Sequence, residues 1–141
     1  MRLMSSKILN DLNNLINTNM EELTGYKSAA GIIHNDGLKE IFVIYIQKKS
    51  EYIDELKRVA KELFGNGEKA RDFPLQKFSI SMSGNESSIL KKCQTLEEKS
   101  IKKYESVLNN EIPPHIKEML LKQCNGIKEA QLHMKSLENE Y

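Results

Sequence analysis

The chain has 141 residues, the size of a single domain that can bury a substantial core. Its 21 basic and 20 acidic residues give a net charge of +1, which leaves no excess of positive charge for a nucleic-acid partner. The longest apolar run, 41–46, is too short to cross a bilayer, and residues 1–6 lack the apolar run of a signal peptide. We therefore expect a cytoplasmic protein without membrane insertion.

The first half of the chain predicts a helical hairpin. Residues 6–33 repeat apolar side chains every three to four positions, and the polar break at 34–37 is too short for anything but a tight connection. Residues 38–64 continue the helical spacing, although the run 41–46 alone has the composition of a strand. No turn signal follows that run, so the pattern favours a helix and leaves a strand as the alternative.

The second half predicts another hairpin after a long connection. Residues 65–85 carry glycines, a proline and apolar residues, and they are far more than a helical hairpin needs. Helices are predicted at 87–108 and 114–139, with Pro114 suited to a first helical turn. We expect one domain, 1–141, with an all-α, ferritin-like four-helix bundle of two antiparallel hairpins joined by a long crossover. The pattern leaves open whether the crossover is extended or helical.

Carboxylates interrupt two apolar stripes near the middle of their helices. Glu22 lies on the first stripe and Glu97 on the third, and a tyrosine follows each within two turns. A buried carboxylate is costly unless it is paired, hydrogen-bonded or bound to metal. One interpretation is a buried polar network in which a carboxylate accepts hydrogen bonds from tyrosines or a lysine. Its predicted members are Glu22, Tyr26, Tyr52, Glu97 and Tyr104.

The alternative is a divalent metal site at the same height. Its candidate ligands are Glu22, Glu97, Glu51 and Gln123, a set of oxygen donors that suits hard ions. A ferritin-type di-iron site also requires Glu-x-x-His on two helices, and no histidine of this chain has a glutamate three residues before it. We therefore expect no cofactor, with a divalent metal such as iron or manganese as the alternative.

Three apolar residues of the second helix lie off its core stripe: Val43, Ile44 and Ile46. Exposed apolar patches of this kind often mark partner surfaces, so we predict a homodimer interface there. Coverage by the crossover is the alternative. The chain carries no nucleophile-elbow, phosphate-loop or dinucleotide-binding motif.

A series of short features follows in a characteristic order and spacing between about residues 8 and 137. They are Glu22 to Tyr26, Phe42 with Tyr45, Cys93-x-x-x-Glu97 with Tyr104, Ile112-Pro113-Pro114, and Gln123. In these the chain resembles the bacterial four-helix-bundle family called domain of unknown function 2383, within the ferritin-like superfamily. The resemblance implies two helical hairpins and no particular function. The chain departs from it at Gln131, where the resemblance leads us to expect a histidine, and this departure weakens the metal interpretation.

Together these patterns predict a non-catalytic structural or protein-interaction module. The alternative function is a metal-binding or ferritin-like redox protein that uses the mid-bundle carboxylates. If those carboxylates served only an absent metal, replacing Glu22 and Glu97 by glutamine would leave stability equal or higher.

Overall fold

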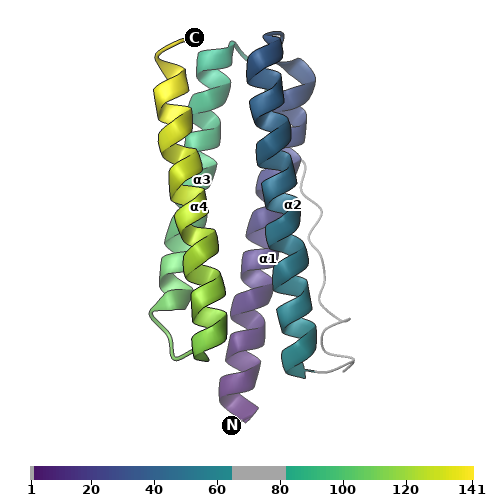
Figure 1. Cartoon of the computed structure of the whole chain (residues 1–141), viewed down its shortest axis with the longest axis vertical. Coiled ribbons are helices and arrows are strands. Elements are labelled where there is room, and N and C mark those ends of the chain that lie inside the picture. The colour runs from purple at the N-terminus through teal and green to yellow at the C-terminus, as the bar shows by residue number, and fades with distance from the viewer. Residues whose placement is uncertain (1, 65–81) are drawn as a thin grey trace.

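The fold is seen in a computed structural model that describes residues 2–64 and 82–141. These residues form four helices and no strand: α1 (Arg2–Ile32), α2 (Asp36–Phe64), α3 (Glu86–Leu108) and α4 (Pro114–Glu138). Figure 1 shows them side by side as an elongated bundle. The run 41–46 lies inside α2, so the helix prediction is confirmed there. Most of the predicted crossover, 65–81, lies outside the described residues.

Short polar segments connect and cap the helices. Asn35 accepts a hydrogen bond from the backbone N–H of Leu38 at 2.9 Å and so caps α2. Asn85 caps α3 by accepting from the backbone N–H of Ser88 at 2.8 Å. The backbone N–H of Asn35 also donates to the Glu86 carboxylate at 3.2 Å, which places the start of α3 beside the α1–α2 turn.

This contact fixes the topology of the bundle. Because α2 and α3 begin at the same end, they run parallel (Figure 1). The antiparallel pairs are α1 with α2 and α3 with α4. This is the arrangement of two hairpins with a long crossover that the sequence predicts.

The four helices do not pack equally. The contacts between α1 and α3 join the two hairpins closely, whereas α2 and α4 touch only sparsely. The side of the bundle formed by α2 and α4 is therefore its loosest seam, and buried groups behind it are the ones most easily reached from outside.

The core is divided into two apolar clusters along the bundle axis. One cluster contains Leu15, Ile53, Ile101 and Ile127, and the other contains Tyr26, Phe42, Cys93 and Met134. In α1, α2 and α3 the two clusters are separated by buried polar residues, among them Glu22, Lys49, Glu97 and Ser100. A polar section therefore crosses the middle of the bundle.

The predicted interface residues differ in exposure. The side chains of Val43 and Ile44 are 54% and 55% exposed, whereas Ile46 is half-buried against the second apolar cluster. Leu132 of α4 is also exposed. No helix in the described part of the chain is both long and apolar enough to cross a membrane.

Candidate functional site

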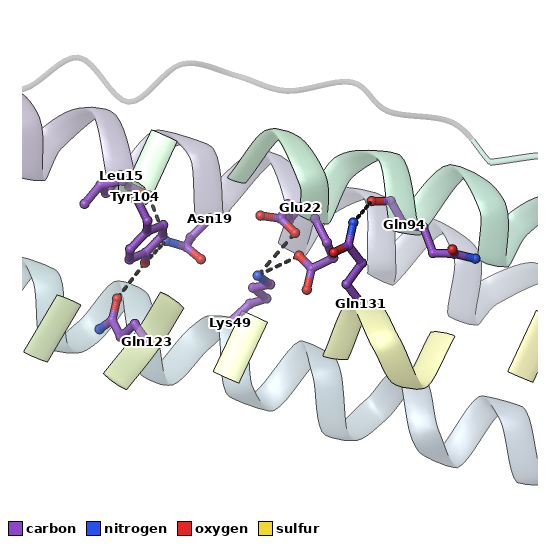
Figure 2. A network of polar contacts seen from close by, with 9 residues as sticks. Leu15, Asn19, Glu22, Lys49, Gln94, Tyr104, Gln123 and Gln131 are labelled. Atoms are coloured by element: carbon purple, nitrogen blue, oxygen red, sulfur yellow. Dashed lines mark hydrogen bonds and ion pairs between the residues drawn. The ribbon is translucent and has the colours of Figure 1, made fainter. Parts of the chain in front are cut away.

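A lysine side chain is buried between two carboxylates at the centre of the polar section. The Lys49 Nζ atom lies 3.2 Å from Glu22 Oε2 and 2.8 Å from Glu97 Oε1. The three side chains are 3%, 2% and 0% exposed, respectively. They come from α2, α1 and α3, and Figure 2 shows the ammonium reaching between the two carboxylates. We call these three residues the charged cluster.

The helical periodicity of α2 directs Lys49 into the core. Lys49 follows Tyr45 by four residues and precedes Tyr52 by three, so it continues the buried face that those tyrosines share. A lysine can place its aliphatic stem among apolar neighbours and its charged end on a polar partner. The apolar stripes of the sequence do not single out Lys49, although the stripe of α2 has a gap of six residues between Tyr45 and Tyr52. That gap was the signal.

Burial controls the ionisation of the charged cluster. Desolvation raises the pKa of Glu22 above its ordinary value, and the positive charge of Lys49 opposes this rise. Desolvation lowers the pKa of Lys49, against the attraction of Glu22. Two ionised carboxylates and one ammonium would leave one uncompensated negative charge. Burial of Glu22 thus favours the protonated, uncharged form of its carboxyl.

Several polar atoms around the cluster lack hydrogen-bond partners among the described residues. Both carboxylate oxygens of Glu22 and of Glu97 are buried and have only the ion pairs with Lys49. The hydroxyls of Ser100 and Tyr26 lie near Glu22, yet neither makes a well-formed hydrogen bond to a described residue. Unpaired buried polar atoms are uncommon in folded proteins and require an explanation.

A second, mostly neutral layer lies further along the bundle. Asn19 of α1 donates to the Tyr104 hydroxyl of α3 at 2.8 Å, and that hydroxyl donates to Gln123 Oε1 of α4 at 2.6 Å. Gln123 Nε2 then donates to Glu55 of α2 at 2.7 Å, where the chain of bonds reaches the surface. This Asn19–Tyr104–Gln123–Glu55 layer, drawn in part in Figure 2, connects all four helices.

The predicted site residues fall into separate places. Glu22 and Glu97 meet in the charged cluster, whereas Tyr104 and Gln123 belong to the neutral layer. The Tyr52 ring lies 5.7 Å from Lys49 Nζ, a cation–π distance. Glu51 does not join either group: its side chain is exposed, because two residues after Lys49 is nearly the opposite face of a helix.

A pocket opens between α2 and α4 and ends at the charged cluster. Its volume is about 330 Å³, and its inner wall includes Lys49, Glu97 and Tyr52. On α4 the wall combines two small residues, Gly126 and Ala130, with the larger Ile127, Glu129 and His133. A β-carbon at position 126 would collide with the Tyr52 hydroxyl, so glycine is what allows Tyr52 to lie against α4 here.

A di-iron centre does not fit the residues at this height. Such a centre takes glutamates from two helices and Glu-x-x-His from the other two. Here α2 supplies Lys49 with Tyr52 three residues later, and α4 supplies Gly126 and Ala130. Within residues 6–63 and 82–141 no three His, Cys, Asp or Glu side chains are grouped to hold a metal ion. An ammonium group thus lies where a metal would need to be.

Gln131, the position where the family resemblance suggests histidine, bonds outside the core. Its side-chain N–H group donates to Glu98 at 2.8 Å and to the backbone carbonyl of Gln94 at 3.3 Å, so it ties α4 to α3. Tyr45 and His133 form a similar tie between α2 and α4, with 2.6 Å between the hydroxyl and Nδ1. Neither contact reaches the charged cluster's carboxylates.

Known proteins resemble this chain in fold and in sequence pattern. A crystal structure of ferritin-like, diiron-carboxylate proteins from Bacillus anthracis str. Ames superposes with a TM-score of 0.70 and 16% identity, over 96% of this chain and 95% of that one. At this identity the likeness shows a shared ferritin-like fold. Among curated proteins, none matches the sequence. The family described as Domain of unknown function (DUF2383) matches residues 7–110, and the chain belongs to that family.

Proposed function

We propose that this protein is a non-catalytic structural or protein-interaction module in which a lysine replaces the metal of a ferritin-like bundle. One observation carries the proposal: the Lys49 ammonium lies 3.2 Å and 2.8 Å from the two carboxylates that α1 and α3 direct into the core. A cation fixed to the chain offsets one of these two negative charges without any ion from solution.

The charged cluster also opposes the entry of a divalent ion. A metal that bound Glu22 and Glu97 would have to displace Lys49 or lie close to its positive charge, and α4 offers it no ligand from Gly126 or Ala130. Two carboxylates alone are fewer ligands than iron or manganese takes in bundles of this type. These features support a bundle whose function does not use a bound metal.

The second candidate is a metal-binding or ferritin-like redox protein. It is supported by the two carboxylates and by the structural similarity to a diiron-carboxylate protein. It requires the Lys49 side chain to leave the space between Glu22 and Glu97. The lowered pKa of Lys49 works in this direction, because a neutral amine is held less tightly by the carboxylates.

We also propose that the module forms a homodimer through α2. The support is the exposure of Val43 and Ile44, adjacent apolar residues on a helix whose other face is in the core. Ile46 is left out of this surface because it packs inward. The cytoplasmic location stays a prediction from the sequence.

The test is an anaerobic titration of the untagged protein with Fe²⁺ and with Mn²⁺, in which calorimetry measures metal binding. Oxygen is then added to the iron sample, and the rate of iron oxidation is measured. We expect no stoichiometric binding by the wild type or by the exposed control variant Lys48→Met. Stoichiometric binding that disappears in Glu22→Gln/Glu97→Gln would contradict the proposal and establish the metal alternative.

A further inference from the structure

The α2–α4 pocket reaches a buried carboxylate whose bonding is incomplete. Glu97 is fully buried, its Oε1 atom is paired with Lys49, and its Oε2 atom has no hydrogen-bond donor among the described residues. Glu97 is also one of the residues that line the pocket. A donor that entered the pocket would therefore meet an acceptor that the described part of the protein does not satisfy.

The balance of charge in the cluster indicates which kind of molecule would bind. Glu22 and Glu97 carry two negative charges when ionised, and Lys49 supplies one positive charge. A second monovalent cation would complete the balance. An anion would instead raise the uncompensated charge at a buried position, and the nearby Lys49 is already engaged by both carboxylates.

The walls of the pocket favour an organic cation over a bare ion. The Tyr45 and Tyr52 rings line it, and a cation near such rings gains a favourable electrostatic interaction. Ile44, Ile127 and Ala130 provide apolar surface for an alkyl chain. The volume of about 330 Å³ is at the lower end of the range for small-molecule sites, ~300–1,000 Å³.

We propose that the α2–α4 pocket binds a small protonated primary amine, with its ammonium group on Glu97 and its alkyl chain against Ile127 and Ala130. The ammonium donates to the Glu97 oxygen that Lys49 leaves unpaired, and its positive charge offsets the second carboxylate of the charged cluster. Glu129 and His133 line the same pocket, as does Lys48. Their formal charges nearly cancel when His133 is neutral, so the buried carboxylates determine the preference for a cation.

This inference is independent of the proposed structural role, because it concerns a monovalent organic ligand in the pocket and not a metal in the cluster. A protein that binds neither iron nor manganese could still bind the amine. The metal titration tests the structural role, and the amine titration tests the pocket, so the failure of one proposal is distinguishable from the failure of the other.

The test compares three probes of similar shape by NMR titration and calorimetry at pH 7 and constant ionic strength: n-butylammonium, 1-butanol and butyrate. We expect saturable binding of n-butylammonium, with shifts of the Tyr45 and Tyr52 ring signals, and no comparable binding of the neutral or anionic probe. Equal binding of 1-butanol would contradict the proposal, as would an n-butylammonium titration that does not saturate.

Two variants and a control locate the binding. Glu97→Gln should weaken n-butylammonium binding at least tenfold, whereas Glu98→Gln, which removes an exposed carboxylate outside this pocket, should leave it unchanged. Because Glu97→Gln also removes an ion pair and could impair folding, Ala130→Leu provides a second test that fills the pocket and keeps the cluster intact. Unchanged affinity in Ala130→Leu would place any binding elsewhere and overturn the proposal.

Discussion

The bundle contains two buried polar layers, and they are constructed differently. In the Asn19–Tyr104–Gln123–Glu55 layer, hydrogen bonds run through all four helices and end at a partly exposed carboxylate. In the charged cluster, only three helices contribute and the carboxylate oxygens lack donors beyond Lys49 among the described residues. Nearly all polar side-chain atoms of the first layer have hydrogen-bond partners within that layer, whereas those of the charged cluster do not.

This difference indicates where the function of the molecule is to be sought. A nearly complete network stabilises one arrangement of the helices and needs no further partner, as expected for a structural role. A charged network with unpaired atoms is costly to bury, so the charged cluster is the better place to look for a function. The pocket between α2 and α4 reaches the incomplete layer, to which α4 contributes no member of the charged cluster.

The largest expected effect comes from removing the cation, as in Lys49→Met. This leaves two buried carboxylates without their counter-charge and should lower the free energy of unfolding by about 3–5 kcal/mol at pH 7. Without Lys49 the pKa of Glu22 in the folded state rises further above its unfolded value. Stability should therefore recover as the pH falls toward the unfolded pKa and decline as the pH rises. Urea unfolding at several pH values between 5 and 8 measures both effects.

The matched control is Lys48→Met, which changes an exposed neighbour and should alter stability by no more than about 0.5 kcal/mol. If Lys49→Met were as stable as this control at pH 7, the cluster would not be an obligatory ion pair, and the contrast between the two layers would be lost.

The reverse change, Glu22→Gln with Glu97→Gln, tests the same contrast from the other side. The carboxylates alone suggest that stability would stay equal or increase, but the buried Lys49 reverses that expectation because it would lose both partners. We expect a loss of several kcal/mol at pH 7. Here stability should rise with pH, since an unpaired buried lysine has a folded pKa below its unfolded value and the unfolded state binds more protons. A pH slope of the same sign as in Lys49→Met would contradict the ion-pair assignment.

In the neutral layer, Tyr104→Phe should cost less and should show almost no dependence on pH. The change leaves the Asn19 amide and the Gln123 carbonyl without their shared hydroxyl, a loss of about 1–3 kcal/mol. Burial raises the pKa of Tyr104, so its hydroxyl stays protonated between pH 5 and 8 and no titration intervenes. Urea unfolding of Tyr104→Phe at pH 5 and pH 8 should give the same difference from the wild type; a marked slope would show that the two layers are coupled.

The fold could be predicted from the sequence to a greater degree than the site. Helical periodicity and the long connection suffice for a ferritin-like bundle, and Glu22 and Glu97 are visible because a carboxylate on an apolar stripe is conspicuous. Lys49 escaped because a lysine on a helix is usually solvated, so only the gap between Tyr45 and Tyr52 marked it. Glu51 is a predicted ligand only because it lies at the same level along the bundle axis as Glu22 and Glu97. That criterion ignores the direction in which a side chain points around the helix axis.

The pocket could not be predicted from the sequence for a different physical reason. Periodicity identifies which face of each helix is buried but not how closely two faces approach. The sparse packing of α2 on α4 depends on small residues such as Gly126 and Ala130 meeting the bulky Tyr52 across the seam. Hydrogen-bond partners such as Gln123 and Glu55 likewise depend on the relative rotation of two helices.

The smallest expected effect on stability, and a direct test of the open side of the charged layer, comes from Ile44→Lys. Ile44 is 55% exposed and is one of the residues that line the pocket, so the proposed dimer surface adjoins the seam between α2 and α4. We expect the free energy of unfolding at low protein concentration to change by no more than about 0.5 kcal/mol, because little of the core is altered.

The informative measurement on Ile44→Lys is the molar mass by light scattering after size-exclusion chromatography. A buried lysine without a partner would oppose association, so a wild-type dimer should become a monomer. Leu121→Lys, which alters an exposed apolar residue of α4 that is not part of the pocket, should leave the dimer intact. A dimer that persists in Ile44→Lys would mean that the α2 surface is free in solution.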